Sequence, residues 1–197
     1  MKKIIFSAII IIIMIIYSIT LFSVDSANLL NTNYVEYNCD VKIFNLNTKI
    51  NISKNDKSFA SVSGNILKLI EDPLTMYDVN DNKIGYAGDT YHFISQDSHG
   101  IYVDNQFKCD MVGKVDFIGE SYDIYDKDEN LIAKMQLNGA NTKGILYDLD
   151  NNLLAEYNSG YFYYDFDIKI YDNCTLDHRT VLMLFCSYYS DYSADNG

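Results

Sequence analysis

Apolar side chains recur at every second position in several short segments of this 197-residue chain, and Asn, Asp and Gly separate the segments. The clearest segment is residues 161–171, YFYYDFDIKIY. One of its faces carries Phe162, Tyr164, Phe166, Ile168 and Ile170. Successive side chains of a strand point to opposite faces, so this period predicts a half-buried strand. Residues 131–137 and 101–104 show the same alternation, and the chain is therefore predicted to be mainly β.

Three segments, 76–85, 124–133 and 146–155, repeat one pattern: an apolar residue, Tyr-Asp, a polar turn and a second apolar run. Asp and Asn suit such turns because they accept left-handed backbone and bond their own main chain. Each copy predicts a β-hairpin. Their starts are separated by 48 and then 22 residues, which is too irregular for a solenoid or a propeller.

The period changes near the C-terminus, where residues 176–189 are expected to form a helix with Asp177 in its first turn. One face carries the candidate central-helix residues Val181, Leu184, Phe185 and Tyr188. The opposite face carries Leu182, Met183, Cys186 and Tyr189. A helix that is apolar on all sides must be enclosed by protein, and this one is too short to cross a membrane. We predict a closed antiparallel β-barrel of about twelve strands around this helix, over residues 34–192, with a short tail at 193–197.

Residues 4–22, from Ile4 to Phe22, contain no charged side chain. As a helix they would reach roughly 28 Å, about the thickness of the hydrocarbon core of a bilayer. Lys2 and Lys3 precede this run, so a single-pass anchor over residues 1–22 is expected to keep its N-terminus inside and place the rest outside the cytoplasm. Residues 23–33 are expected to be a linker.

A cleaved signal peptide is the alternative, with residues 24–26 as the cleavage site and a secreted product. The apolar run is longer than the core of most signal peptides, which favours the anchor.

The chain carries 15 Lys and Arg against 27 Asp and Glu, a formal net charge of −12. Such acidity excludes a nucleic-acid partner, because phosphate binding needs clustered cations. Apolar residues make up 48% of the chain, enough for a real core. Richness in Ile, Asn, Lys and Tyr with a single Arg fits a bacterial genome rich in A and T.

The four cysteines are Cys39, Cys109, Cys174 and Cys186. Four cysteines allow three pairings, and four unpaired thiols are an alternative of at least equal weight. Cys186 is expected to be a small buried apolar residue, so any disulfide is expected among the other three.

The hairpins and the segment DHRTVLMLFCSYYSD at residues 177–191 resemble the tubby C-terminal superfamily, in its LURP-one-related and phospholipid-scramblase-like branch. The resemblance covers residues 38–192 and implies a twelve-stranded barrel around a hydrophobic C-terminal helix. It also implies lipid binding or lipid translocation as a possible function. Asp81, Glu129 and Asn151 stand where that family's turns carry Gly, and the family's basic cluster for phosphoinositides is absent.

Other chemistry is weakly indicated. Two acidic turns, 126–130 and 148–152, space oxygens like a calcium loop but lack its Gly and its bidentate Glu, so solvated hairpin turns are favoured. His92, Asp97 and His99 are considered as zinc ligands, and exposed histidines at strand ends are favoured over them. His178 is assigned to the start of the helix.

Neither a nucleophile elbow nor a phosphate-binding loop is present in the sequence. No catalytic, metal or cofactor site is therefore expected, and an unrecognised carboxylate pair is the only enzymatic alternative.

The tyrosines are assigned to packing, with a surface platform for sugars or peptides as the alternative. The tyrosines considered are Tyr161, Tyr163, Tyr164, Tyr171, Tyr188, Tyr189 and Tyr192. The sequence thus predicts a non-catalytic binding or scaffold protein in the cell membrane, whose partner is an envelope protein or a lipid.

Overall fold

The computed structural model describes residues 10–12, 14, 27–30, 32–44, 47–65, 74–89, 98–114, 120–160 and 165–195. The predicted membrane segment from Ile4 to Phe22 lies outside the described residues except for 10–12 and 14. Those four residues are helical, and their side chains are 42–63% exposed. Within the described ranges, no helix has both the length and the apolar character that a membrane crossing requires.

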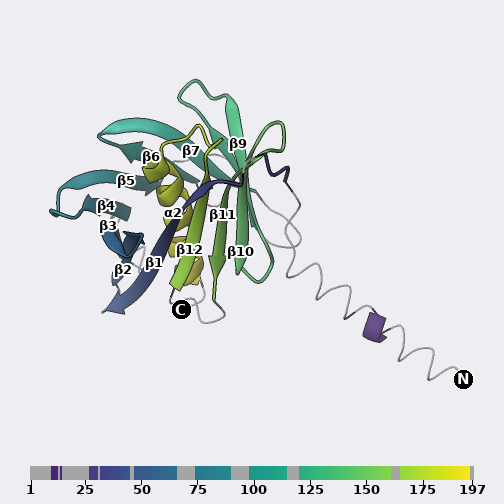
Figure 1. Cartoon of the computed structure of the whole chain (residues 1–197), viewed down its shortest axis with the longest axis horizontal. Helices are drawn as coiled ribbons and strands as arrows, with labels where there is room; N and C mark the ends of the chain where they lie inside the picture. The colour runs from purple at the N-terminus through teal and green to yellow at the C-terminus, as the bar shows by residue number, and fades with distance from the viewer. Residues whose placement is uncertain are drawn as a thin grey trace, which may run out of the picture.

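Twelve antiparallel strands in the described part of the chain close into a barrel, in which consecutive strands are neighbours and the first pairs with the last. This arrangement confirms the predicted closed antiparallel barrel of twelve strands (Figure 1). The strands are β1 (Tyr34–Phe44), β2 (Asn47–Lys54), β3 (Lys57–Asn65), β4 (Leu74–Asp78), β5 (Lys83–Asp89), β6 (Ser98–Val103), β7 (Gln106–Lys114), β8 (Glu120–Tyr125), β9 (Leu131–Leu137), β10 (Lys143–Asp148), β11 (Leu153–Ser159) and β12 (Asp165–Tyr171). Closure removes the exposed strand edges on which other chains could pair.

The period-two pattern marks the inward face where the strands are described. Phe166, Ile168 and Ile170 of β12 are at most 2% exposed and belong to the core. The inward residues of β9 and β6 are also buried, among them Met135 and Ile101. The strand predicted over 161–171 begins at Asp165, and its first four residues lie outside the described part.

The three repeated segments are the β4–β5, β8–β9 and β10–β11 hairpins, as predicted. In the β8–β9 turn the Asp126 carboxylate accepts hydrogen bonds from the backbone N–H groups of Asp128 at 2.8 Å and Asn130 at 2.9 Å. Asp78 and Asp148 do the same in their turns. The fourth residue of each turn is left-handed, with φ of 60° at Asp81, 60° at Glu129 and 64° at Asn151.

One end of the barrel, here called the turn end, carries these three tight turns together with the β2–β3 and β6–β7 turns. Each of the latter two has two residues at positive φ, which matches the twist of the strands they join. The chain enters β1 and leaves β12 at the turn end as well, because Tyr34 pairs with Tyr171.

The final element, α2 (His178–Asp195), begins at the turn end and lies among the strands, with β4–β6 on one side and β10–β12 on the other (Figure 1). It begins two residues later and ends six residues later than predicted, so most of the expected tail is helical. Asp177 precedes the helix as its cap: its carboxylate accepts a hydrogen bond from the Arg179 N–H at 2.8 Å. The prediction that Asp177 lies in the first turn is therefore wrong by one residue.

Replacing Glu129 by Gly is expected to stabilise the chain. A side chain at left-handed φ costs roughly 1–2 kcal/mol, whereas the extra freedom of Gly in the unfolded chain costs roughly 0.5–1 kcal/mol. We expect a net gain of about 0.5–1 kcal/mol in the free energy of unfolding, measured by denaturant titration in mild detergent. Asn151→Gly is the matched control and should be near neutral, because Asn tolerates this conformation. A lower denaturation midpoint for Glu129→Gly than for the parent would contradict the strain attributed to the left-handed backbone at Glu129.

Candidate functional site

The interior of the barrel is occupied by the protein's own helix. Every residue from Val181 to Tyr189 is buried, and the four candidate central-helix residues are at most 1% exposed. Those four are Val181, Leu184, Phe185 and Tyr188. They form one cluster with the inward side chains of the strands, so the predicted enclosure of the helix is correct. The barrel does not present its interior to a ligand along this stretch.

Aromatic contacts hold the helix against the wall of the barrel. Phe185 stacks on Tyr157 of β11, with ring centroids 5.7 Å apart and planes inclined by 16°. Tyr189 stacks on Phe166 of β12, with centroids 5.2 Å apart. Such pairs add directional preference to plain burial, so they fix the rotation of α2 about its axis.

The only arginine of the chain fastens the start of α2 to the barrel rim. Arg179 donates two hydrogen bonds to the carboxylate of Asp104, at 2.9 and 2.8 Å, and also bonds Asp177. Asp104 lies in the β6–β7 turn at φ 52°. A two-point guanidinium–carboxylate pair fixes geometry as well as charge. The neighbouring carboxylates raise the pKa of Arg179.

A second rim contact joins the helix to the opposite wall. The hydroxyl of Tyr37 on β1 lies 2.9 Å from Nδ1 of His178. Burial, and then the nearby Lys54, lower the pKa of His178, so the neutral imidazole is favoured at pH 7. Burial also raises the pKa of Tyr37. Both groups are thus neutral and bonded to each other, as expected of a structural contact.

The acidic turns use their oxygens internally. The carboxylate of Asp126 accepts bonds from two backbone N–H groups and from the Asn130 side chain. The hydrogen bonds from Asn130 are the main reason that the pKa of Asp126 is lowered. Asn82 lowers the pKa of Asp78 in the same way. The described residues contain no group of three or more His, Cys, Asp or Glu side chains placed to hold a metal ion.

The four cysteines are unpaired thiols in the structure. Three of them are buried, and Cys174 is partly buried. Burial raises the pKa of the Cys109 thiol to about 12 and raises that of Cys186 further. Thiols held in this protonated state are poor nucleophiles and poor metal ligands.

Of the two histidines considered as zinc ligands, only His99 lies among the described residues. His99 is buried on β6 at 7% exposed, so the expectation of an exposed histidine at a strand end is wrong for it. Its neighbours on the strand, Gly100 and Ile101, are buried too, which explains the difference. His92 and Asp97 lie outside the described residues.

Tyr171, Tyr188 and Tyr189 are at most 6% exposed, which agrees with a packing role. Tyr161, Tyr163 and Tyr164 lie outside the described residues, as does the side chain of Tyr192. The outer surface instead carries a partly exposed aromatic pair that the sequence pattern did not single out. Tyr86 of β5 stacks on Tyr102 of β6, with centroids 4.5 Å apart, and Lys83 lies over the Tyr86 ring at 4.2 Å.

The middle of the predicted linker is attached to the barrel. Residues 27–30, here called the strap, run beside the start of β11. The Asn28 N–H donates to the carbonyl of Asn151 at 2.7 Å, and the Asn28 carbonyl accepts from the Leu153 N–H at 2.8 Å. Ala27 packs on an outer-face cluster of Ile145, Leu153 and Tyr171. This part of the segment predicted as a linker is therefore bonded to the barrel through its main chain, an attachment that has no side-chain signature in the sequence.

The described residues define a class of protein: a closed antiparallel barrel that encloses its own C-terminal helix, with polar turns at one end. No family model and no curated protein matches the sequence. The fold is similar to the X-ray structure of a protein from Arabidopsis thaliana, with a TM-score of 0.55 at 9% sequence identity. That similarity covers 80% of this chain and 91% of the plant protein, and at this identity it shows the fold alone.

Truncating a central-helix side chain should destabilise the whole barrel. Leu184→Ala removes a fully buried side chain and is expected to lower the free energy of unfolding by about 2–5 kcal/mol. Leu149→Ala is the matched control, since Leu149 is 57% exposed, and it should change stability by less than about 0.5 kcal/mol. Denaturant titration in mild detergent measures both. Equal losses of stability in the two variants would show that α2 is not part of the hydrophobic core.

The turn at Asp126 should make stability depend on pH in the acid range. Asp126 has a pKa below its ordinary value of 3.8 in the folded chain, so its contribution is complete above about pH 4 and is lost as the pH falls through the folded pKa. Asp126→Asn should retain the turn, because Asn138 caps the β9–β10 turn through the same kind of bonds. The variant is expected to lose less stability than the parent between pH 5 and about pH 2, measured by thermal melting. An identical loss of stability in the parent and in Asp126→Asn would show that Asp126 is not a source of the pH dependence.

Proposed function

We propose that this chain is a membrane-anchored binding or scaffold protein, without catalysis, whose barrel lies outside the cytoplasm. The observation that carries the proposal is the occupied interior: the side chains of α2 from Val181 to Tyr189 fill the space where a barrel of this kind would otherwise hold a ligand. Recognition then falls to the outer surface and the rims.

The state of the reactive groups supports a role without catalysis. The thiol pKa values are raised, the His178 ring is bonded to Tyr37, and the Asp126 carboxylate is engaged within its own turn. Catalytic groups are usually poised near the working pH and directed toward a substrate position. Neither condition holds for these residues.

The anchor rests on the sequence. The uncharged run from Ile4 to Phe22 has the length of a membrane helix and follows two lysines. The exposure of Ile10, Ile11, Ile12 and Met14 supports it, because exposed apolar side chains are costly in water. A partner in the cell envelope, either a protein or a lipid, is the expected ligand class.

Topology of the full-length chain tests the proposal. Expressed in a bacterium, the chain should remain in the membrane after alkaline extraction, and protease added outside spheroplasts should reach the barrel. Intact-mass measurement should show an uncleaved N-terminus, whereas loss of about 25 residues would indicate the secreted alternative. If the barrel is protected from external protease, the proposed location outside the cytoplasm is wrong.

Lipid binding or translocation is the second candidate, favoured by exposed leucines on the strap and on the β10–β11 turn. It differs from the first proposal because the lipid itself would be the substrate. Reconstituted vesicles carrying the full chain should then move labelled lipid between leaflets faster than empty vesicles. Equal rates of lipid movement in the two kinds of vesicle would exclude translocation, and the binding or scaffold role would then stand as the proposal.

A further inference from the structure

Four of the exposed large apolar side chains of the described residues lie at one corner of the barrel. The large apolar side chains that are exposed are Ile10, Ile11, Ile12, Met14, Leu29, Leu30, Tyr34, Val79 and Leu149. The first four belong to the apolar N-terminal run. All of the others except Val79 lie on the strap, at the start of β1 or on the β10–β11 turn. We call Leu29, Leu30, Tyr34 and Leu149 the strap corner; they are 54%, 64%, 44% and 57% exposed.

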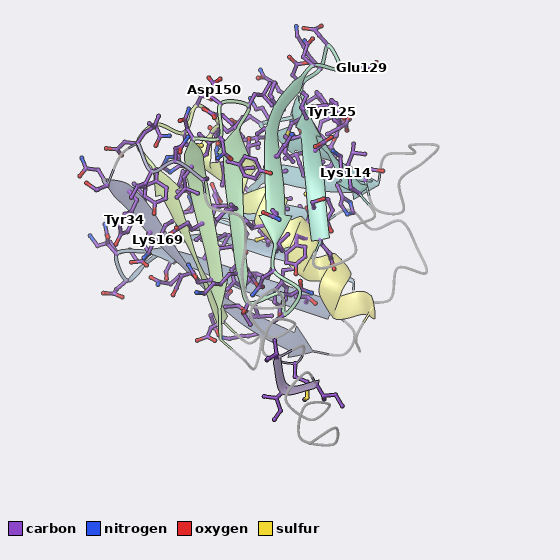
Figure 2. All side chains as sticks on the ribbon, turned by 90° about the vertical axis from the view of Figure 1, so that its right-hand side faces the viewer. Tyr34, Lys114, Tyr125, Glu129, Asp150 and Lys169 are labelled. Carbon is purple, nitrogen blue, oxygen red and sulfur yellow. The ribbon has the colours of Figure 1, made fainter. Side chains whose placement is uncertain are left out.

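Backbone bonds bring these residues to the same corner. Leu29 and Leu30 follow Asn28, whose N–H bonds the carbonyl of Asn151, two residues after Leu149. The ring of Tyr34 lies edge-on to Tyr171, with centroids 5.8 Å apart, and Tyr171 belongs to the cluster on which Ala27 packs. Figure 2 looks onto this side of the barrel, with Tyr34 beside Lys169 and Asp150 near the turn end.

The tether between this corner and the apolar run is short. Four residues, 23–26, separate Phe22 from Ala27. Five extended peptide units of about 3.6 Å span at most about 18 Å. If residues 4–22 cross a bilayer, the strap corner must therefore lie at or near its surface. This length selects a lipid surface as the occupant, because the tether leaves little depth for a protein between the corner and the membrane.

We propose that the strap corner rests on the membrane that holds residues 4–22. Leu29, Leu30 and Leu149 enter the boundary between headgroups and acyl chains, and Tyr34 lies at headgroup level. Tyr has an apolar ring with a polar tip, which suits this depth, and Lys169 above the Tyr34 ring can extend toward phosphate. The inference rests on the proposed membrane anchor and adds the orientation of the barrel: its β10–β12 face turns toward lipid.

Charge selects the kind of lipid. Asp148 and Asp150 flank Leu149 in the turn, and the residues from 148 to 153 include no Lys or Arg. Carboxylates near an anionic surface are repelled over about one Debye length, which is about 10 Å at 0.1 M salt. The corner therefore fits zwitterionic lipid better than anionic lipid.

A unique fluorophore tests the contact, since the chain contains no Trp. Leu149→Trp is made in the full-length chain and reconstituted in phosphatidylcholine vesicles with brominated acyl chains, which quench nearby indole. Val79→Trp is the matched control, because Val79 is 60% exposed and directly follows the turn Asp, as Leu149 does. Leu29→Trp is a second probe of the corner. Flotation of the vesicles reports separately whether the chain is inserted.

Quenching at positions 149 and 29 that exceeds quenching at position 79 by at least about twofold supports the inference, since the corner is placed at the depth of an interfacial side chain. Addition of phosphatidylglycerol at low salt should reduce quenching at position 149, and salt should restore it. Flotation with equal quenching at positions 149 and 79 would overturn the orientation and leave the anchor standing. Failure of the chain to float would overturn the anchor and this inference together.

Discussion

The whole structure depends on the burial of one helix. Because residues 181–189 of α2 carry apolar side chains on every side, no single sheet could cover them, and a closed wall of strands removes this stretch from water. The inward face of each described strand is in turn too apolar to face a water-filled channel, so wall and helix require each other. Charge contributes mainly at the rim, where Arg179 and Asp104 set the position at which the helix enters.

The turn end shows how the sequence specifies a barrel with few glycines. In the repeated turns an Asp gathers the backbone N–H groups and the fourth residue takes left-handed φ without being Gly. Glu129 is the least suited to that conformation, and its turn has the same shape as the one that ends in Asn151. The side-chain cap of Asp126 therefore outweighs the local preference of Glu129.

Sequence reasoning reached the fold through patterns that repeat along the chain: alternation in β9 and β12, the Tyr-Asp turns, and the all-round apolar character of residues 181–189. It missed features made by residues distant in sequence. The pairing of Arg179 with Asp104 joins positions 75 residues apart, and the strap joins Asn28 to Asn151 through main-chain atoms alone. Neither leaves a periodic signal. The sequence also places the end of α2 too early, at residue 189 instead of Asp195. The mostly polar residues 190–195 continue the helix without any apolar pattern that would predict it.

The position of α2 in the chain has a consequence for biosynthesis. The segment that fills the barrel is translated after every strand, and the closing strand β12 is made just before it, so β1 has no closing partner while most of the chain is being synthesised. Contacts such as that between Tyr37 and His178, 141 residues apart, can form only after synthesis of that last segment. The barrel must therefore remain open until β12 and the helix have been synthesised. Any chain that stops before residue 178 would expose an unfilled apolar interior to quality-control proteases.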